Sequence, residues 1–174
     1  TPAYSARIQF FPVGGLLLTP SVQHQLISER NAAYTSFDIG ASYERAGFHI
    51  EAEYLHKAYT QGAFSPCDAV NSMFIYRQQI KKESSFLQSI SYLLRYDRMG
   101  DHSDGKKGFD SETDKLILSD LGRQRITAGM TFAVRNQLFP TDIRINYEKY
   151  IYSSDLAPKE SEMDKIALEV MIRF

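Results

Sequence analysis

The amino-acid sequence predicts an all-β chain folded as an antiparallel up-and-down transmembrane β-barrel, in a single domain over residues 1–174. Apolar and polar residues alternate along most of the chain, and this period of two is typical of strands with two different faces. The alternating segments are about ten residues long, which fits tilted membrane strands of about 9–11 residues better than soluble strands of about 5–6. The links between the segments are alternately short and long, as in membrane barrels.

Nine segments are predicted to be strands because every second residue in them is apolar. In chain order they cover residues 3–11, 16–28, 34–44, 48–59, 72–81, 85–98, 123–134, 142–152 and 165–174. Eight of them are defined by an apolar row: Ala6, Ile8, Phe10; Phe37, Ile39, Ala41, Tyr43; Phe48, Ile50, Ala52, Tyr54; Phe74, Tyr76, Ile80; Phe86, Ile90, Tyr92, Leu94, Tyr96; Ile126, Ala128, Met130, Phe132, Val134; Ile143, Ile145, Tyr147, Ile151; and Ile166, Leu168, Val170, Ile172, Phe174. The second segment, 16–28, is interrupted by Pro20, which indicates a sheet edge or a bulge. In the fifth, Gln78 interrupts the row.

The last segment fixes the expected direction of every strand. Its apolar row ends on the aromatic residue Phe174, and in this it resembles the C-terminal signal strand of bacterial outer-membrane β-barrels. We therefore expect Phe174 at the periplasmic rim. Counting back, the expected periplasmic turns are 135–141, 82–84, 45–47 and 12–15, and the expected external links are 153–164, 99–122, 60–71 and 29–33. The acidic link 99–122 is the longest, and no role is assigned to it.

The strand count leaves two alternatives open. With nine strands the first one enters from outside, whereas bacterial single-chain barrels have an even number of strands. We expect the chain to be the C-terminal portion of a larger barrel of about sixteen strands. The alternative is a small closed barrel of eight strands, with one strand miscounted. Such a barrel would have a structural, adhesion or binding role, because side chains fill its interior.

Composition and motifs argue against several other classes of protein. The formal net charge of −1 gives no electrostatic footprint for nucleic acid. Cys67 is the only cysteine, so no disulfide can form within the chain, and we predict that it is an incidental loop residue. The four histidines, His24, His49, His56 and His102, lack metal-type spacing. No catalytic motif is present, so we predict no enzyme activity, no cofactor and no metal.

Four segments resemble strands of phosphate-selective porin O/P-like proteins of the Bacteroidetes type. Residues 6–12 (ARIQFFP) resemble an R-x-x-x-x-P strand, and residues 91–98 (SYLLRYDR) resemble an L-R-Y-D strand that precedes a long acidic loop. Residues 125–130 (RITAGM) and 144–148 (RINYE) resemble the two strands that follow. The resemblance implies a passive porin in the bacterial outer membrane, often a homotrimer, that conducts small hydrophilic or anionic solutes. No lysine-rich loop matches, so no phosphate site is carried over.

The alternation also predicts which residues line the lumen. The pore-lining candidates are Arg7, Lys57, Arg77, Arg95, Arg125, Arg144, Glu51, Glu53 and Glu148. The full lumen face carries equal numbers of acidic and basic residues, which argues for weak selectivity or for ion pairs across strands. Arg95, Arg125 and Arg144 could form a basic ladder. We favour the alternative that they pair with Asp97, Asp142 and Glu148 to hold the wall.

The opposite face is expected to contact outer-membrane lipid. The aromatic residues expected at the periplasmic membrane interface are Tyr43, Phe48, Phe86, Phe132 and Phe174. The competing interpretation is a soluble, lipocalin-like barrel, in which the same apolar rows would point inward.

Overall fold

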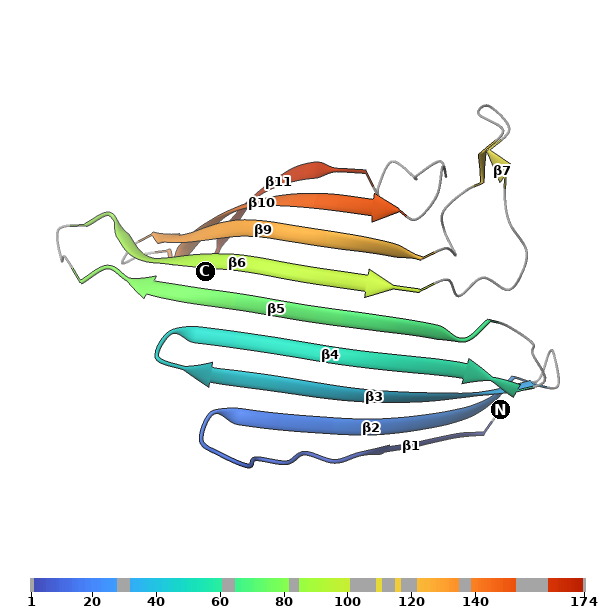
Figure 1. The fold of residues 1–174 in the computed structure, drawn as a ribbon. Coiled ribbons are helices and arrows are strands. Elements are labelled where there is room, and N and C mark those ends of the chain that lie inside the picture. Colours follow the sequence, from blue (N-terminus) through green and yellow to red (C-terminus); the bar gives the residue numbers. More distant parts are fainter. Residues whose placement is uncertain are drawn as a thin grey trace.

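The fold is a single curved antiparallel sheet of nine strands (Figure 1). The computed structural model describes residues 2–27, 32–60, 65–81, 85–100, 109–110, 115–116, 122–134, 139–152 and 163–173. The strands are β1 (Ala3–Arg7), β2 (Leu16–Ile27), β3 (Ala32–Arg45), β4 (Phe48–Tyr59), β5 (Cys67–Gln79), β6 (Leu87–Met99), β9 (Arg123–Val134), β10 (Thr141–Tyr152) and β11 (Lys165–Ile172). Each pairs with its neighbours in chain order, so the all-β, up-and-down prediction is confirmed. Among the described residues there is no helix long and apolar enough to cross a membrane.

Two very short strands, β7 (Phe109–Asp110) and β8 (Lys115–Leu116), form a separate hairpin between β6 and β9. Sequence alternation did not predict this hairpin. β1 and β11 are the two edges of the large sheet, and they are not paired with each other. Figure 1 marks the N-terminus and the C-terminus toward opposite ends of the sheet.

The link between β3 and β4 is a two-residue hairpin turn. Ala46 and Gly47 both have positive φ, 51° and 86°, as a type I′ turn requires. A Cβ on Gly47 would lie 2.8 Å from the backbone oxygen of Arg77, so glycine is also needed for space. At the link before β2, Leu16 N–H donates to the Val13 carbonyl over 3.1 Å, and Gly15 takes the positive φ of 86°. Both turns fall where the sequence predicted them.

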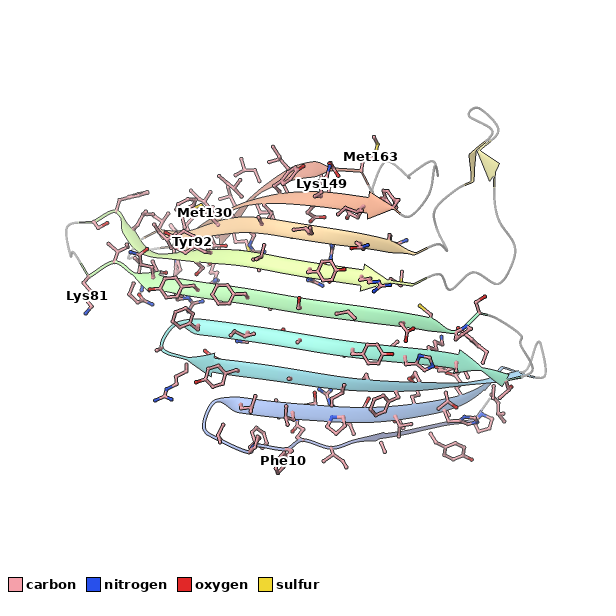
Figure 2. All side chains as sticks on the ribbon, viewed as in Figure 1. Phe10, Lys81, Tyr92, Met130, Lys149 and Met163 are labelled. Carbon is pink, nitrogen blue, oxygen red and sulfur yellow. The ribbon has the colours of Figure 1, made fainter. Side chains whose placement is uncertain are left out.

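The sheet has one apolar and one polar face, because cross-strand partners point to the same side. One row of consecutive partners from β4 to β11 is Phe48, Tyr76, Tyr92, Met130, Ile145 and Leu168. A row on the other side is Glu51, Met73, Arg95, Thr127, Glu148 and Lys165. We name these sides the apolar face and the polar face. In Figure 2, Tyr92 and Met130 project from the neighbouring strands β6 and β9.

The apolar face has no cover in the described part of the chain. Only two apolar side chains there are buried, those of Ala33 and Cys67. The apolar face instead carries exposed side chains on every long strand, including Val22, Phe37, Ile39, Ile50, Phe74, Leu94, Ile126, Ile145, Ile166 and Val170. The 19.9 kDa chain exposes 11930 Å², whereas a compact monomer of that mass exposes about 8,700 Å². The described strands therefore enclose no apolar core.

Three of the predicted strands need a correction that changes the place of a named residue, and other predicted bounds differ by one or two residues. The ladder of β1 ends at Arg7, although an isolated bridge follows between Phe10 and Leu18. Pro20 explains this break. Its carbonyl accepts a hydrogen bond from Ile8 N–H, on the side that faces β1. Because proline has no backbone N–H, the second hydrogen bond of the ladder on that side cannot form. β5 begins at Cys67 rather than at residue 72, so Cys67 is a strand residue and not a loop residue.

The third correction concerns Phe86. A bulge between Leu87 and Ser89 places Leu87 opposite Val134 and shifts the alternation at the start of β6. Phe86 therefore precedes the strand, is 71% exposed, and does not continue the row that Ile90 begins. The bounds predicted for β4 and β9 are confirmed without change.

Candidate functional site: the polar face of the sheet

The polar face brings together all the lumen candidates that the sequence predicted. All of them lie on this face, because rows of direct cross-strand partners connect their positions on neighbouring strands. They are Arg7, Lys57, Arg77, Arg95, Arg125, Arg144, Glu51, Glu53 and Glu148. The face is hollowed. Four hollows, of about 520, 310, 280 and 230 Å³, are lined mainly by its side chains. The sheet is therefore concave on its charged side and convex on its apolar side.

A chain of ion pairs crosses four strands at the centre of this face. Asp97 accepts from Arg95 over 2.8 Å through one oxygen and from Arg125 over 2.9 Å through the other. The second terminal nitrogen of Arg125 lies 3.6 Å from Glu148, which in turn lies 3.5 Å from Lys165 Nζ. The pairing expected for Arg95 and Arg125 is confirmed, and neither guanidinium is a free cation.

The third arginine is paired, but not as predicted. Arg144 lies 3.2 Å from Glu169, its direct partner on β11. Asp142, one of the three carboxylates expected to pair with these arginines, instead accepts from Arg173 over 2.6 Å. Arg144 and Glu169 come together because they are direct partners on the neighbouring strands β10 and β11. The three arginines therefore do not form an open basic ladder.

The carboxylates of β3 and β4 have weaker partners. Asp38 accepts from the hydroxyl of Ser21, and Glu51 lies 2.8 Å from His49 Nε2. Glu53 makes no ion pair or hydrogen bond within the part of the chain that the structure describes. Lys57 lies over the rings of Tyr34 and Tyr59, at 4.1 and 5.1 Å from their centroids. This part of the polar face thus keeps a surplus of uncompensated negative charge.

The apolar face carries aromatic residues near both ends of the strands. Near the short turns, Phe48 stacks on Tyr76 with ring centroids 4.7 Å apart, and Tyr76 stacks on Tyr92 at 6.3 Å. Of the predicted interface aromatics, Tyr43, Phe48 and Phe132 lie on this face. Phe86 has left the row, and Phe174 lies outside the described residues.

Sequence reasoning missed a second aromatic row near the long links. Tyr54, Tyr96 and Tyr147 lie on the apolar face. The hydroxyl of each donates a hydrogen bond to a polar residue that lies on the neighbouring strand or just before that strand begins. The acceptors are Asp68 at 2.6 Å, Gln124 at 2.9 Å and Asp164 at 3.4 Å. Each tyrosine thus has an apolar body and a tethered polar tip, as aromatic residues at a membrane interface do. The sequence identifies these three tyrosines only as members of alternating rows.

Asp164, just before β11, is the last of these three acceptors along the chain. It accepts from Lys149 Nζ over 2.7 Å and from the backbone N–H of Tyr150 over 2.8 Å. These two donors, with Lys149 the larger cause, hold the pKa of the Asp164 carboxyl below its ordinary value.

The histidines are distributed singly. His24 lies 3.0 Å from Thr35, His49 contacts Glu51, and His56 lies 2.7 Å from Asp68. His102 falls outside the described residues, as does most of the acidic link. Within the described ranges, no three His, Cys, Asp or Glu side chains gather as ligands for a metal. Comparisons with protein-family models, curated proteins and solved structures found no match to this chain.

Proposed function

We propose that this sheet is part of the wall of a bacterial outer-membrane porin, a β-barrel that forms a passive aqueous channel for small hydrophilic solutes. In this proposal the apolar convex face contacts lipid and the charged concave face lines the water-filled lumen. No chemical step and no cofactor are involved. The observation that carries the proposal is the path that the boundary of the apolar band takes across the strands.

On the side of the long links, one polar residue on each strand from β2 to β11 interrupts the apolar row, and exposed apolar side chains lie beyond it on β2 (Leu26) and β10 (Ile151). From β2 to β11 these residues are His24, Thr35, His56, Asp68, Arg98, Gln124, Lys149 and Asp164. They form four neighbouring pairs: three are direct cross-strand partners, and the fourth is the ion pair of Lys149 and Asp164. Together the four pairs form one polar boundary across these eight strands.

The boundary does not run straight across the sheet. Thr35 is opposite Ala58, so His56 lies two residues closer to the short turns. The next two steps are the same, because Arg98 is opposite Val70 and Ile151 is opposite Gln124. The polar boundary thus moves by two residues at every second strand, or one residue per strand on average.

This slope has the value expected for strands that cross a membrane at an angle. A shift of one residue, about 3.3 Å, for each strand spacing of about 4.8 Å corresponds to a tilt of about 35°. Transmembrane barrel strands tilt by about 35–45°. A plane parallel to a membrane would therefore cut this sheet along the observed polar boundary.

The width of the band supports the same interpretation. On β5 the band lies between the polar residues Asp68 and Gln78. Ten residues of strand rise about 33 Å, which is about 27 Å when projected at a 35° tilt. The lipid-facing apolar band of outer-membrane barrels is about 25 Å tall. The two aromatic rows described above lie at the two margins of this band.

The alternative, a small closed barrel of eight strands, is less well supported. The sheet already contains nine paired strands and leaves both edges open. Eight strands leave an interior that side chains fill, whereas about sixteen leave an aqueous channel. The hollowed polar face is consistent with the wider lumen. A homotrimer, and membership of the phosphate-selective porin O/P-like proteins, remain predictions from the sequence resemblance.

The proposal is tested by conductance. The full-length protein, folded in detergent and added to planar lipid bilayers, is expected to produce stepwise increases in current. A folded protein that enters bilayers without producing channels would contradict the porin and favour the small closed barrel. A protein that stays monomeric and folded in water without detergent would contradict both.

A further inference from the structure

The basic side chains of the polar boundary recur at a regular interval. Each of its four pairs contains one of them: His24 on β2, His56 on β4, Arg98 on β6 and Lys149 on β10. Because β9 follows β6 in the sheet, these residues stand on every second strand. A line of basic groups therefore marks one margin of the apolar face.

Lysine, arginine and carboxylate side chains occur on the apolar face of the described strands only near its margins. On the nine strands of the sheet they are Arg45, Arg98, Lys149 and Asp68. Arg45 ends β3 at a short turn, and the other three belong to the polar boundary. A charge within the hydrocarbon of a membrane is costly, so this distribution fits a face that contacts acyl chains between two headgroup layers.

Lys149 and Asp68 are both held by neighbouring side chains. Lys149 Nζ lies 2.7 Å from Asp164. One oxygen of Asp68 accepts from the Tyr54 hydroxyl over 2.6 Å and lies 2.7 Å from His56 Nδ1. The charge of Lys149 is therefore compensated within the described residues, and Asp68 is already shared by two side chains of β4.

Arg98 differs from both, because its guanidinium group makes no hydrogen bond or ion pair with the residues that the structure describes. Its cross-strand partners are Val70 and Gln124, and the side-chain oxygen of Gln124 already accepts from the Tyr96 hydroxyl. Asp68 is near enough for its charge to interact with Arg98, but the two side chains form no ion pair. An exposed side chain with five N–H donors thus stands at the polar boundary without an acceptor among the described residues.

We infer that Arg98 binds the phosphate group of an anionic lipid, whose acyl chains lie along the apolar face beside it. This inference rests on the proposed channel, and in particular on the contact of the apolar face with lipid. The guanidinium group is a planar fork that donates two parallel hydrogen bonds to a phosphate. In a headgroup layer, the phosphate oxygens supply the acceptors that the described part of the chain does not.

The residues beside Arg98 favour a lipid over a soluble phosphate compound. On the side toward the short turns, Leu94 on the same strand and Ile126 on β9 belong to apolar rows, and their exposed fractions are 54% and 37%. A soluble anion would gain only the contact with the guanidinium group. A lipid gains in addition from the apolar surface that its acyl chains cover.

The local charge balance depends on Arg98. Asp68 is the only carboxylate on the described strands of this face, and Arg98 is the arginine whose charge acts on it. Without Arg98, an anionic headgroup would lose its hydrogen-bond donor and would face the charge of Asp68. A headgroup with no net charge would be affected less by the same change.

The test measures which lipid the full-length protein retains. The protein is folded in detergent micelles that contain equal amounts of anionic phosphatidylglycerol and zwitterionic phosphatidylcholine, and the lipids that remain after washing are quantified by mass spectrometry. We expect wild type to retain more phosphatidylglycerol, and Arg98→Gln to lower the ratio of the two lipids by about fivefold. Arg98→Lys, which keeps the charge but loses the fork, is expected to give an intermediate ratio. The matched control is Arg7→Gln, which removes an exposed arginine of the polar face and is expected to leave the ratio unchanged.

The outcomes separate the lipid site from the channel itself. If the protein forms channels but the ratio is the same in wild type and Arg98→Gln, the channel stands and the lipid site is overturned. If wild type forms no channels and retains neither lipid, the proposed channel is wrong. If an excess of inorganic phosphate lowers the wild-type ratio as far as Arg98→Gln does, and chloride at the same ionic strength does not, the site takes soluble anions and its assignment to lipid is overturned. If Arg98→Gln fails to fold, Arg98→Lys decides, because a ratio equal to that of wild type overturns the contact between guanidinium and phosphate.

Discussion

The side chain of Asn146 on β10 covers the backbone of Gly129, its direct partner on β9. The side-chain oxygen of Asn146 occupies the position that a Cβ on residue 129 would take, and the Ile145 carbonyl oxygen would be only 3.0 Å from that Cβ. The same oxygen is buried without a hydrogen-bond partner in the described part of the chain. The two strands are therefore closely packed at this point of the polar face.

This packing predicts that Gly129→Ala is destabilising. The added methyl group would have to displace Asn146 and press on the backbone of β10, and overpacking of this kind costs about 1–3 kcal/mol. The free energy of unfolding is measured by denaturant titration of the protein in lipid vesicles. Gly14→Ala is the matched control, because a Cβ there has nothing within 4 Å. Equal stabilities for the two variants would show that β9 and β10 can separate easily at this point.

The ion-pair network predicts a difference between two neighbouring carboxylates. Asp97→Asn removes the charged acceptor that Arg95 and Arg125 share, and leaves the two guanidinium groups to repel each other. We expect a loss of about 1–2 kcal/mol in the free energy of unfolding. Glu53→Gln, two strands away from Asp97 in the cross-strand row of Glu53, Asn71 and Asp97, is expected to cost little because none of the described cations is paired with Glu53. A similar loss in both variants would mean that Asp97 has no special role in holding the wall.

The oblique apolar band predicts different membrane depths for two residues that share one row. Ile39 on β3 and Ile151 on β10 are connected through consecutive partners on the apolar face. Ile39 lies inside the polar boundary and Ile151 lies beyond Lys149, outside it. In a Cys67→Ser background, Ile39→Cys is expected to resist water-soluble thiol reagents, whereas Ile151→Cys is expected to react. Equal protection of both would contradict the tilt.

The contact between Asp164 and Lys149 predicts a pH dependence. The pKa of Asp164 is lowered in the folded protein, so the stability it contributes is fully present above the ordinary aspartate pKa of about 3.9 and is lost as the pH falls through the lowered value. Asp164→Asn is therefore expected to lower the melting temperature at neutral pH but not at about pH 2. A difference between wild type and variant that persists in strong acid would assign the effect to the shape of the side chain and not to its charge.

Much of the fold could be predicted from the sequence because a strand places alternate residues on opposite faces. The assignment of Glu51, Arg95 and Arg125 to one face needs only their position in each alternating row, and the structure places them together. Phe86 shows the limit of this reasoning. A single bulge between Leu87 and Ser89 moved it out of its row, and nothing in the local pattern indicates a bulge there.

The parts that could not be predicted depend on the register between strands. Arg144 contacts Glu169 and not Asp142 because β10 and β11 place the first two opposite each other. The row of Tyr54, Tyr96 and Tyr147 likewise becomes visible only when the strands are aligned, since it shifts along the sheet from one strand to the next. Sequence alternation identifies the face on which a residue lies but not its depth.

The open edges of the sheet have a consequence for assembly. In the described sheet, β1 and β11 each use only one side of their backbone for pairing. If the sheet lies in a membrane as proposed, lipid cannot hydrogen-bond to the N–H and C=O groups on the other side. In a sheet of nine alternating strands, the first and the last point in the same direction. Joining them directly would therefore create a parallel seam. An entirely antiparallel ring requires an odd number of additional strands between them, whichever chain supplies those strands.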